Sequence, residues 1–447
     1  MTNNNKYYQD GSKPKHGASK RDSKTQPSSS PSGHGGQHRS KKEDINPNRP
    51  SREQAYDPRD YDSVHAEAGN RPGLKAQHVT AIRWLAEITD ADVDGLEVGS
   101  TTLTFCPRLP PPTALEGKPR FIRIAADSDA ASTLLILQAI LPFLLYAPDT
   151  EAEPTPFELE LTGGTNVSFS LSYEYLDQVL LPRLQDVFGV RVDRRLKKRG
   201  WSLGSQGRGS ICLTIHPLKR GEALRLLNPG IPTYNDPADF EVKRINVSMI
   251  VPSNLHAELQ DTLSRDITAA LPGAEISFEL VEDSGHAARI YVLLVARSAS
   301  GRLRWGRDVL MSPPKKGNGK NGKRGENVLS SVISHRVVGE LVREVAMRGS
   351  TCDEYLQDQI VIFQVLAEGR TSFPGGSDID VDDATVLQQD VAKLELGERM
   401  RRDRTDKPIG DGSMHSQTAK WVASQILPGV EWYNKGAICQ GAGTSFI

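Results

Sequence analysis

The feature that most constrains this chain is a recurring order of strand, helix and paired strands. Residues 157–161 (FELEL) alternate apolar and charged side chains, as in a strand with one buried face, and the run ends at a glycine pair. Residues 130–146 form a strongly apolar helix that Pro142 should interrupt, and residues 173–188 form a second helix. Such elements bury one face each, so helices should cover one face of a sheet. We therefore predict an α+β fold of repeated units, with further elements at 74–88, 102–105, 121–124, 190–194 and 210–215.

The same pattern begins again after residue 246. Apolar strands at 247–251, 276–280 and 290–295 surround a helical stretch at 255–271. This predicts a small inserted α/β domain over residues 241–310. Residues 71–240 would then form the first part of a larger body, and residues 311–447 its C-terminal part, with helices at 328–347 and 416–426 before a last strand.

Two segments lack the apolar residues of a core. Residues 1–70 contain Ile45 and Val64 as their only large aliphatic residues, so we predict a disordered basic and polar tail. Its short basic clusters could contact RNA, direct nuclear import or simply be solvated. Residues 312–325 are rich in glycine and lysine and contain no acid, which predicts a mobile loop that either contacts RNA phosphates or is solvated.

Charge and cysteine usage exclude several classes of protein. The chain carries 55 lysines and arginines against 56 acids, so any RNA contact must come from local patches and not from an overall field. Its four cysteines show neither zinc-ligand nor disulfide-scaffold spacing, which favours a reducing intracellular compartment. No apolar stretch reaches the length of a membrane helix, so we expect a soluble protein without a membrane partner.

The stretch TCDEYLQDQ at residues 351–359 begins a helix and places unlike side chains on one face. Thr351 and Glu354 stand at capping-box spacing, so the helix should start there. Tyr355, Asp358 and Gln359 share a face at i, i+3 and i+4. From residue types alone, this is either an exposed polar face beside a core helix or a binding face. An apolar stripe elsewhere on the helix comprises Leu356, Ile360, Phe363 and Ala367.

Several short motifs in order give the chain a resemblance to a known family. DEYLQDQ is similar to the signature of the RNA 3'-terminal phosphate cyclase family, and the resemblance extends from about residue 71 to the C-terminus. It implies a body of three related units, each with two helices on a four-stranded sheet, and a small insert. The other matching motifs are GGTN at 163–166, YLDQVLLP at 175–182, RGW at 199–201, HSQT at 415–418 and CQGAG at 439–443.

The resemblance also implies a reaction. The histidine of the family's H-x-x-T motif, here His415, attacks the α-phosphate of ATP and carries AMP on an imidazole nitrogen. The AMP passes to an RNA 3'-phosphate, and the neighbouring 2'-hydroxyl closes a 2',3'-cyclic phosphate. The imidazole must be neutral to act as nucleophile, and charge on the phosphoryl oxygens calls for Mg²⁺ and fixed donors. Thr418, one turn later, could orient His415 or cap the helix.

Other site residues follow only from the resemblance. Tyr355, Asp358, Gln359 and Gln138 match residues that bind ATP in the family, with no metal ligand set among them. The turn Gly163, Gly164, Thr165 and Asn166 matches a segment near the same pocket, although a turn that ends a strand would explain it equally. Candidate RNA contacts are Lys315, Lys316, Lys323 and Arg324, which are proposed from the basic charge of residues 312–325 and not from the resemblance, together with Arg71.

The chain also departs from the family pattern. The family's opening E-G-G-G-Q segment has no match in residues 1–70, and R-A-G-R-x-x-P-G-L survives at 66–74 without either arginine position. Residues 201–209 (WSLGSQGRG) replace Y-x-P-K-G-G-G. These losses leave three hypotheses: an ATP-dependent cyclase acting on RNA in the nucleus, an inactive cyclase-like scaffold that binds RNA and preribosomal proteins, or a generic nucleotide-binding module. Retention of His415 favours the enzyme, whereas loss of the opening segment and of the arginines favours the scaffold.

Overall fold

A computed structural model of the chain separates residues 1–67 from a unit of residues 68–447, and every residue described belongs to the second unit. The predicted tail, Arg71, Lys315 and Lys316 lie outside the described residues, and the side chains of residues 322–327 are also outside them. The described ranges are 73–150, 153–205, 207–227, 237–313, 322–347, 349–374 and 412–446.

The first sheet has the strand order β3-β4-β6-β5. Strand β4 (Phe157–Gly163) lies parallel to β3 (Phe121–Ala125) and antiparallel to β6 (Gly209–Ile215), which pairs with the edge strand β5 (Val192–Lys198). The predicted alternation in β4 is confirmed, because Phe157, Leu159 and Leu161 are buried while Glu158 is exposed.

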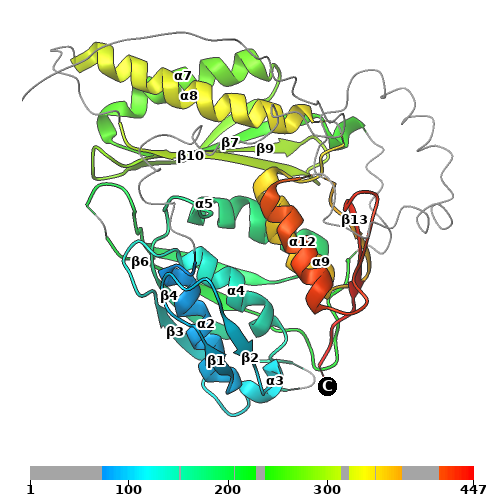
Figure 1. Cartoon of the computed structure of the whole chain (residues 1–447). Coiled ribbons are helices and arrows are strands. Elements are labelled where there is room, and N and C mark those ends of the chain that lie inside the picture. Colours follow the sequence, from blue (N-terminus) through cyan, green and yellow to red (C-terminus); the bar gives the residue numbers. More distant parts are fainter. Residues whose placement is uncertain are drawn as a thin grey trace, which may run out of the picture. The chain divides into compact units, whose positions relative to one another are not determined.

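Helix α4 (Thr133–Leu145) covers this sheet and packs against α2 (Ala76–Thr89), as Figure 1 shows. Ser132 caps α4 by accepting hydrogen bonds from the amides of Leu134 and Leu135. The helix continues through Pro142, so the predicted interruption does not occur. The short elements β1 (Asp92–Asp94), β2 (Thr104–Cys106) and α3 (Pro111–Ala114) lie between α2 and β3 in the chain.

The predicted helix at 173–188 is present but contains a π-helical turn. It consists of α5 (Tyr173–Tyr175), the π segment η3 (Leu176–Leu180) and α6 (Leu181–Phe188). Within it, the amide of Leu181 donates to the carbonyl of Leu176, five residues earlier. Pro182 follows directly and has no N–H to donate, so a wider turn accommodates it. The π turn directs Gln178 towards strand β7 (Val242–Val251), where its Nε2 donates to Ser248 Oγ at 2.8 Å.

The residues of the predicted insert form a second four-stranded sheet, and we call this part of the chain the inserted unit. Its order is β10-β9-β7-β8, with β7 (Val242–Val251) parallel to β8 (Glu275–Asp283) and antiparallel to β9 (Ile290–Ser298). Strand β10 (Arg304–Met311) completes the edge, and the sequence analysis did not predict it.

Two helices, α7 (His256–Ala270) and α8 (Gly322–Ala346), pack on each other over this sheet (Figure 1). Ile267 of α7 and Leu341 of α8 belong to one apolar cluster with the sheet, so we propose that this unit extends beyond residue 310 to include α8. Helix α8 begins at Gly322, so Lys323 and Arg324 are helical and the predicted loop is wrong at these positions.

The C-terminal part packs two helices beside a three-stranded antiparallel sheet. Helices α9 (Glu354–Leu366) and α12 (Met414–Ile426) lie side by side (Figure 1). The sheet order is β11-β13-β12, from β11 (Glu368–Ser372), β13 (Ile438–Ala442) and β12 (Glu431–Tyr433). Gly441 in the CQGAG motif allows β13 to approach α9, because a Cβ there would lie 2.2 Å from the carbonyl oxygen of Ala367. The predicted α+β class is confirmed, and no helix among the described residues is long and apolar enough to cross a membrane.

Candidate nucleotide site

The start of α9 is fixed by a buried aspartate. Asp353 is the N-cap, and its Oδ1 accepts from the amide of Leu356 at 2.9 Å. The same carboxylate accepts from the Tyr175 hydroxyl at 2.5 Å and from the amide of Gly306 at 2.8 Å. Burial raises the pKa of Asp353, and these hydrogen bonds oppose the rise. The predicted capping box is therefore wrong, since Asp353 and not Thr351 caps the helix.

Tyr355 follows in the first turn of α9, and its ring is held between elements far apart in sequence. The guanidinium carbon of Arg307, on β10, lies 4.4 Å from the ring centroid. The ring of Tyr175 meets Tyr355 edge-on at 6.0 Å between centroids. The structure thus gives Tyr355 a fixed, half-buried position one turn before Asp358 and Gln359.

Helix packing brings Asp358 of α9 and His415 of α12 together. The Nδ1 atom of His415 lies 3.9 Å from Oδ2 of Asp358, and the His415 side chain is 89% exposed while that of Asp358 is 21% exposed. Burial raises the pKa of Asp358 to about 6, and the hydrogen bond from Gln359 and the proximity of His415 limit that rise. The carboxylate is therefore ionised above about pH 6 and faces an accessible imidazole.

A largely apolar pocket joins Gln138 of α4 to Gln359 of α9. Both amides line it, 221 positions apart in the chain, with Ser170 as a further polar residue. Because Gln359 Nε2 also donates to Asp358 Oδ1 at 3.0 Å, the pocket is connected to the His415 pair through one side chain. The apolar lining consists of Leu134, Leu135, Leu137, Leu141, Leu171, Leu176, Leu180 and Phe363.

The structure places the side chains of the turn at 163–166 away from this pocket. Thr165 and Asn166 are completely buried, and the Thr165 hydroxyl donates to Asn166 Oδ1 at 2.8 Å. The glycines permit tight backbone packing, since a Cβ on Gly163 would lie 2.6 Å from the Ala131 carbonyl oxygen and one on Gly164 would lie 2.3 Å from a Val167 methyl group. These contacts give the turn a structural explanation that does not involve a ligand.

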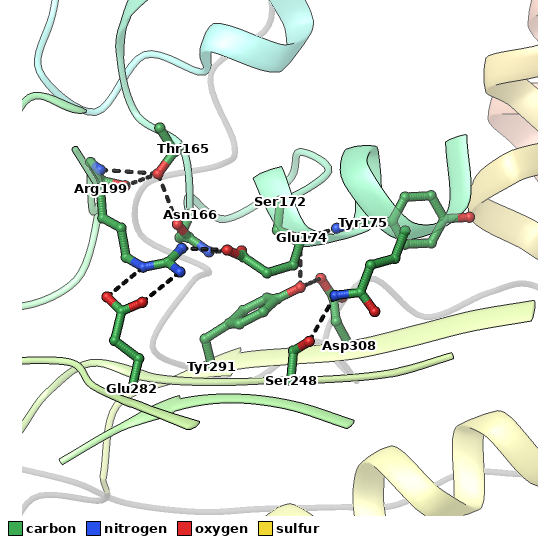
Figure 2. Close-up of polar contacts among 12 residues, drawn as sticks. Thr165, Asn166, Ser172, Glu174, Tyr175, Arg199, Ser248, Glu282, Tyr291 and Asp308 are labelled. Carbon is green, nitrogen blue, oxygen red and sulfur yellow. Dashed lines mark hydrogen bonds and ion pairs between the residues drawn. The ribbon is translucent and has the colours of Figure 1, made fainter. Parts of the chain in front are cut away.

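The turn instead belongs to a polar network between the first sheet and the inserted unit (Figure 2). Asn166 Nδ2 donates to Glu174 Oε2 at 2.8 Å, and Glu174 also pairs with Arg199. Arg199 donates from Nε and Nη2 to the two oxygens of Glu282 on β8, both at 2.8 Å. Burial alone would lower the pKa of Arg199, but the bonds to Glu282 and the charge of Glu174 raise it above its usual value. The arginine of the RGW motif is thus a link between units.

A second polar chain crosses the same junction (Figure 2). The hydroxyls of Ser172, the N-cap of α5, and Tyr291, on β9, lie 2.5 Å apart. Tyr291 donates in turn to Asp308 Oδ2 at 3.1 Å. Burial raises the pKa of Asp308 to about 7, while the bond from Tyr291 opposes the rise. The first sheet's helices and the insert's strands are therefore joined by a hydrogen-bonded chain containing a carboxyl group that titrates near neutral pH.

Sequence reasoning missed two residues that shape the site, Asp353 and Arg307. Asp353 was overlooked because Thr351 offered an equally good local cap, and both are residue types that cap helices. Arg307 was overlooked because strand β10 was not recognised. The available signal was the spacing of Leu303, just before the strand, and of Trp305 and Val309 within it, since all three are apolar, buried and at odd positions.

The described residues contain no group of three or more histidine, cysteine or acidic side chains able to hold a metal ion. An ion that arrives with a nucleotide needs fewer protein ligands, because Mg²⁺ is commonly held by one or two carboxylates together with substrate phosphates.

An α+β body with two glutamines in one pocket, one of them bonded to an aspartate beside an exposed histidine, carries a candidate nucleotide site. The chain belongs to the RNA 3'-terminal phosphate cyclase family, whose model matches residues 62–428. A protein of Drosophila melanogaster named RNA 3'-terminal phosphate cyclase is 30% identical over 309 residues, which cover 68% of this chain and 75% of that protein. Proteins of the same name from Pyrobaculum neutrophilum (30% identical, 69% and 77% covered) and Hyperthermus butylicus (28% identical, 68% and 76% covered) are also similar.

Proposed function

We propose that this chain uses ATP to convert an RNA 3'-terminal phosphate into a 2',3'-cyclic phosphate, with His415 as the carrier of AMP. The observation that carries the proposal is the connected set of Gln138, Gln359, Asp358 and His415, drawn from three helices into one place. Membership of the cyclase family and the names of its similar relatives support the same reaction class.

His415 has the exposure and the setting of a nucleophile. Its Nδ1 faces Asp358, which leaves Nε2 directed elsewhere and able to attack the α-phosphorus of ATP. The new N–P bond forms as the bond to pyrophosphate breaks. His415 also lies in the first turn of α12, where unpaired amides and the helix dipole favour a nearby phosphate. The RNA 3'-phosphate then takes the AMP, and the adjacent 2'-hydroxyl attacks the activated phosphorus and expels AMP.

Asp358 would hold the imidazole in the reactive form. An ionised carboxylate near Nδ1 favours the tautomer with the proton on that nitrogen and stabilises the positive charge that develops when Nε2 bonds to phosphorus. The present separation of 3.9 Å requires only a small approach, as is common before substrate binds. Gln359 fixes the carboxylate by donating to its other oxygen.

The pocket would widen on binding to receive the adenine ring, because its present cavity of about 20 Å³ is smaller than a purine. Its leucine-rich lining supplies apolar contact, and the amides of Gln138 and Gln359 can donate to and accept from the edge of a base. When bound, Mg²⁺ would neutralise charge on the phosphoryl oxygens. We propose the start of α8, with Lys323 and Arg324, as a contact for RNA phosphates.

The test is incubation with α-labelled ATP and Mg²⁺, followed by denaturation and measurement of label that is acid-labile and base-stable, as a phosphoramidate is. Wild type should label, His415→Ala should not, and His335→Ala, which removes another exposed helical histidine, should label normally. RNA ending in a 3'-phosphate should then become resistant to phosphatase, and RNA ending in a 3'-hydroxyl should not change.

Absence of label on folded wild type that still binds RNA or a preribosomal protein would replace this proposal with the scaffold hypothesis. ATP binding without covalent label would indicate the generic nucleotide-binding module. The nuclear location remains a prediction, which imaging of the tagged full-length chain would test.

A further inference from the structure

Strand β10 of the inserted unit meets the first turn of α9 directly. The amide of Gly306 donates to the N-cap carboxylate of Asp353 at 2.8 Å, and the indole N–H of Trp305 donates to the Ser350 carbonyl at 3.3 Å. A Cβ at position 306 would lie 2.7 Å from the ring of Tyr175, so glycine allows the strand to approach this closely. The backbone of β10 therefore determines where α9 begins.

The next residue, Arg307, extends that contact to the side chains of α9. It is 8% exposed, pairs with Glu354 at 2.9 Å and with Glu344 of α8, and places its guanidinium carbon 4.4 Å from the centroid of the Tyr355 ring. A planar guanidinium stacked on an aromatic face is attracted to the ring and also restricts its rotation. Arg307 thus holds two consecutive residues of the first turn of α9.

An arginine near a proposed nucleotide site invites a second reading, in which it binds phosphate. The contacts oppose this reading, because Glu344 and Glu354 already offer two carboxylates to one guanidinium. An incoming phosphate would have to displace one of them and would face the charge of both. The arrangement is that of a clamp on Tyr355 and not of an anion site.

We propose that Arg307 is a positioning residue of the nucleotide site: from the inserted unit, it fixes the ring of Tyr355 and the first turn of α9. One turn later the same helix carries Asp358 and Gln359, so disorder in the first turn would reach both. The inserted unit is then required for a well-formed site in the body. The expected effect on ATP affinity rests on the proposed function, whereas the expected ordering of the first turn of α9 does not.

The test compares Arg307→Gln with Arg304→Gln, a matched variant on the same strand whose arginine pairs with Asp186 of α6. Calorimetry should show ATP affinity about tenfold weaker in Arg307→Gln and unchanged in Arg304→Gln. In a Tyr355→Leu background, Arg307→Gln should cause less than about a twofold further loss, because the ring that it positions is gone. A general loss of stability would not depend on residue 355 in this way.

Hydrogen exchange of the α9 amides supplies a measurement without nucleotide. Exchange over residues 356–359 should be faster in Arg307→Gln than in wild type or Arg304→Gln. If wild type does not bind ATP, the proposed function fails. The exchange result alone then decides whether Arg307 positions the first turn of α9. The proposal would be overturned if Arg307→Gln left the exchange of residues 356–359 unchanged. It would also be overturned if Arg307→Gln weakened ATP binding equally in the wild-type and Tyr355→Leu backgrounds, or if Arg304→Gln had the same effects as Arg307→Gln.

Discussion

Arg199 joins the first sheet to the inserted unit and is bonded to one buried and one exposed carboxylate. Its replacement therefore tests how strongly burial sets the contribution of each ion pair to the free energy of unfolding. Glu174 is 3% exposed, Arg199 is 11% exposed and Glu282 is 41% exposed at their side chains. In Arg199→Met, Glu174 keeps its bond from Asn166 but loses its counter-charge in a buried site. Leaving a buried charge unpaired costs about 3–5 kcal/mol, whereas an exposed pair contributes about 0–1 kcal/mol.

Urea unfolding of the full chain, followed by tryptophan fluorescence, gives the measurement. We expect Arg199→Met to lower the free energy of unfolding by about 3–5 kcal/mol and Glu282→Gln by at most about 1 kcal/mol. Adding Glu174→Gln to Arg199→Met should recover about half of the loss or more, because the unpaired charge is removed. Equal effects of Arg199→Met and Glu282→Gln, or no recovery in the double variant, would refute the argument from burial.

Three further predictions follow from the titrating groups and from β10. Histidine labelling should rise with pH through about 6 as Asp358 ionises, and Asp358→Asn should lower the rate and flatten that profile. The folded-state pKa of Asp308, about 7, exceeds the unfolded value, so this group lowers stability progressively as pH rises from about 4 to 7. The free energy of unfolding of Asp308→Asn, relative to wild type, should therefore rise by about 1–3 kcal/mol from pH 5 to pH 8 in paired urea titrations. A difference that does not change with pH would contradict this. Gly306→Ala should reduce the free energy of unfolding by about 1–3 kcal/mol through the clash with Tyr175, and an unchanged urea midpoint would refute the tight approach.

Local patterns were sufficient for much of the fold. Alternation in residues 157–161 predicted β4, because a strand with one buried face must alternate. The apolar spacing of Leu356, Ile360 and Phe363 predicted the buried face of α9 correctly, and all three are buried. The motifs alone indicate the family, because several short matches in one order rarely coincide by chance.

Other features depended on contacts that no local pattern contains. The cap of α9 was decided by the amide of Gly306 and the hydroxyl of Tyr175, which reach Asp353 from distant segments, while the Thr351 hydroxyl donates to the Pro374 carbonyl instead. Helix α8 begins at Gly322, within a stretch whose glycines favour a loop, and its apolar residues pack on α7. In both places, tertiary packing outweighed a local preference of comparable strength.

The sequence by itself determined which side chains were available for chemistry, namely a histidine, an acid, two amides and a tyrosine in the order typical of one family. Apart from the family resemblance, it could not indicate that Gln138 and Gln359 line one pocket, or that His415 faces Asp358 across two packed helices. Nor could it show that Thr165 and Asn166 are committed to a buried network, or that Arg307 stacks on Tyr355. Those outcomes depend on the burial of apolar faces far apart in the chain, and only the tertiary structure decides which faces meet.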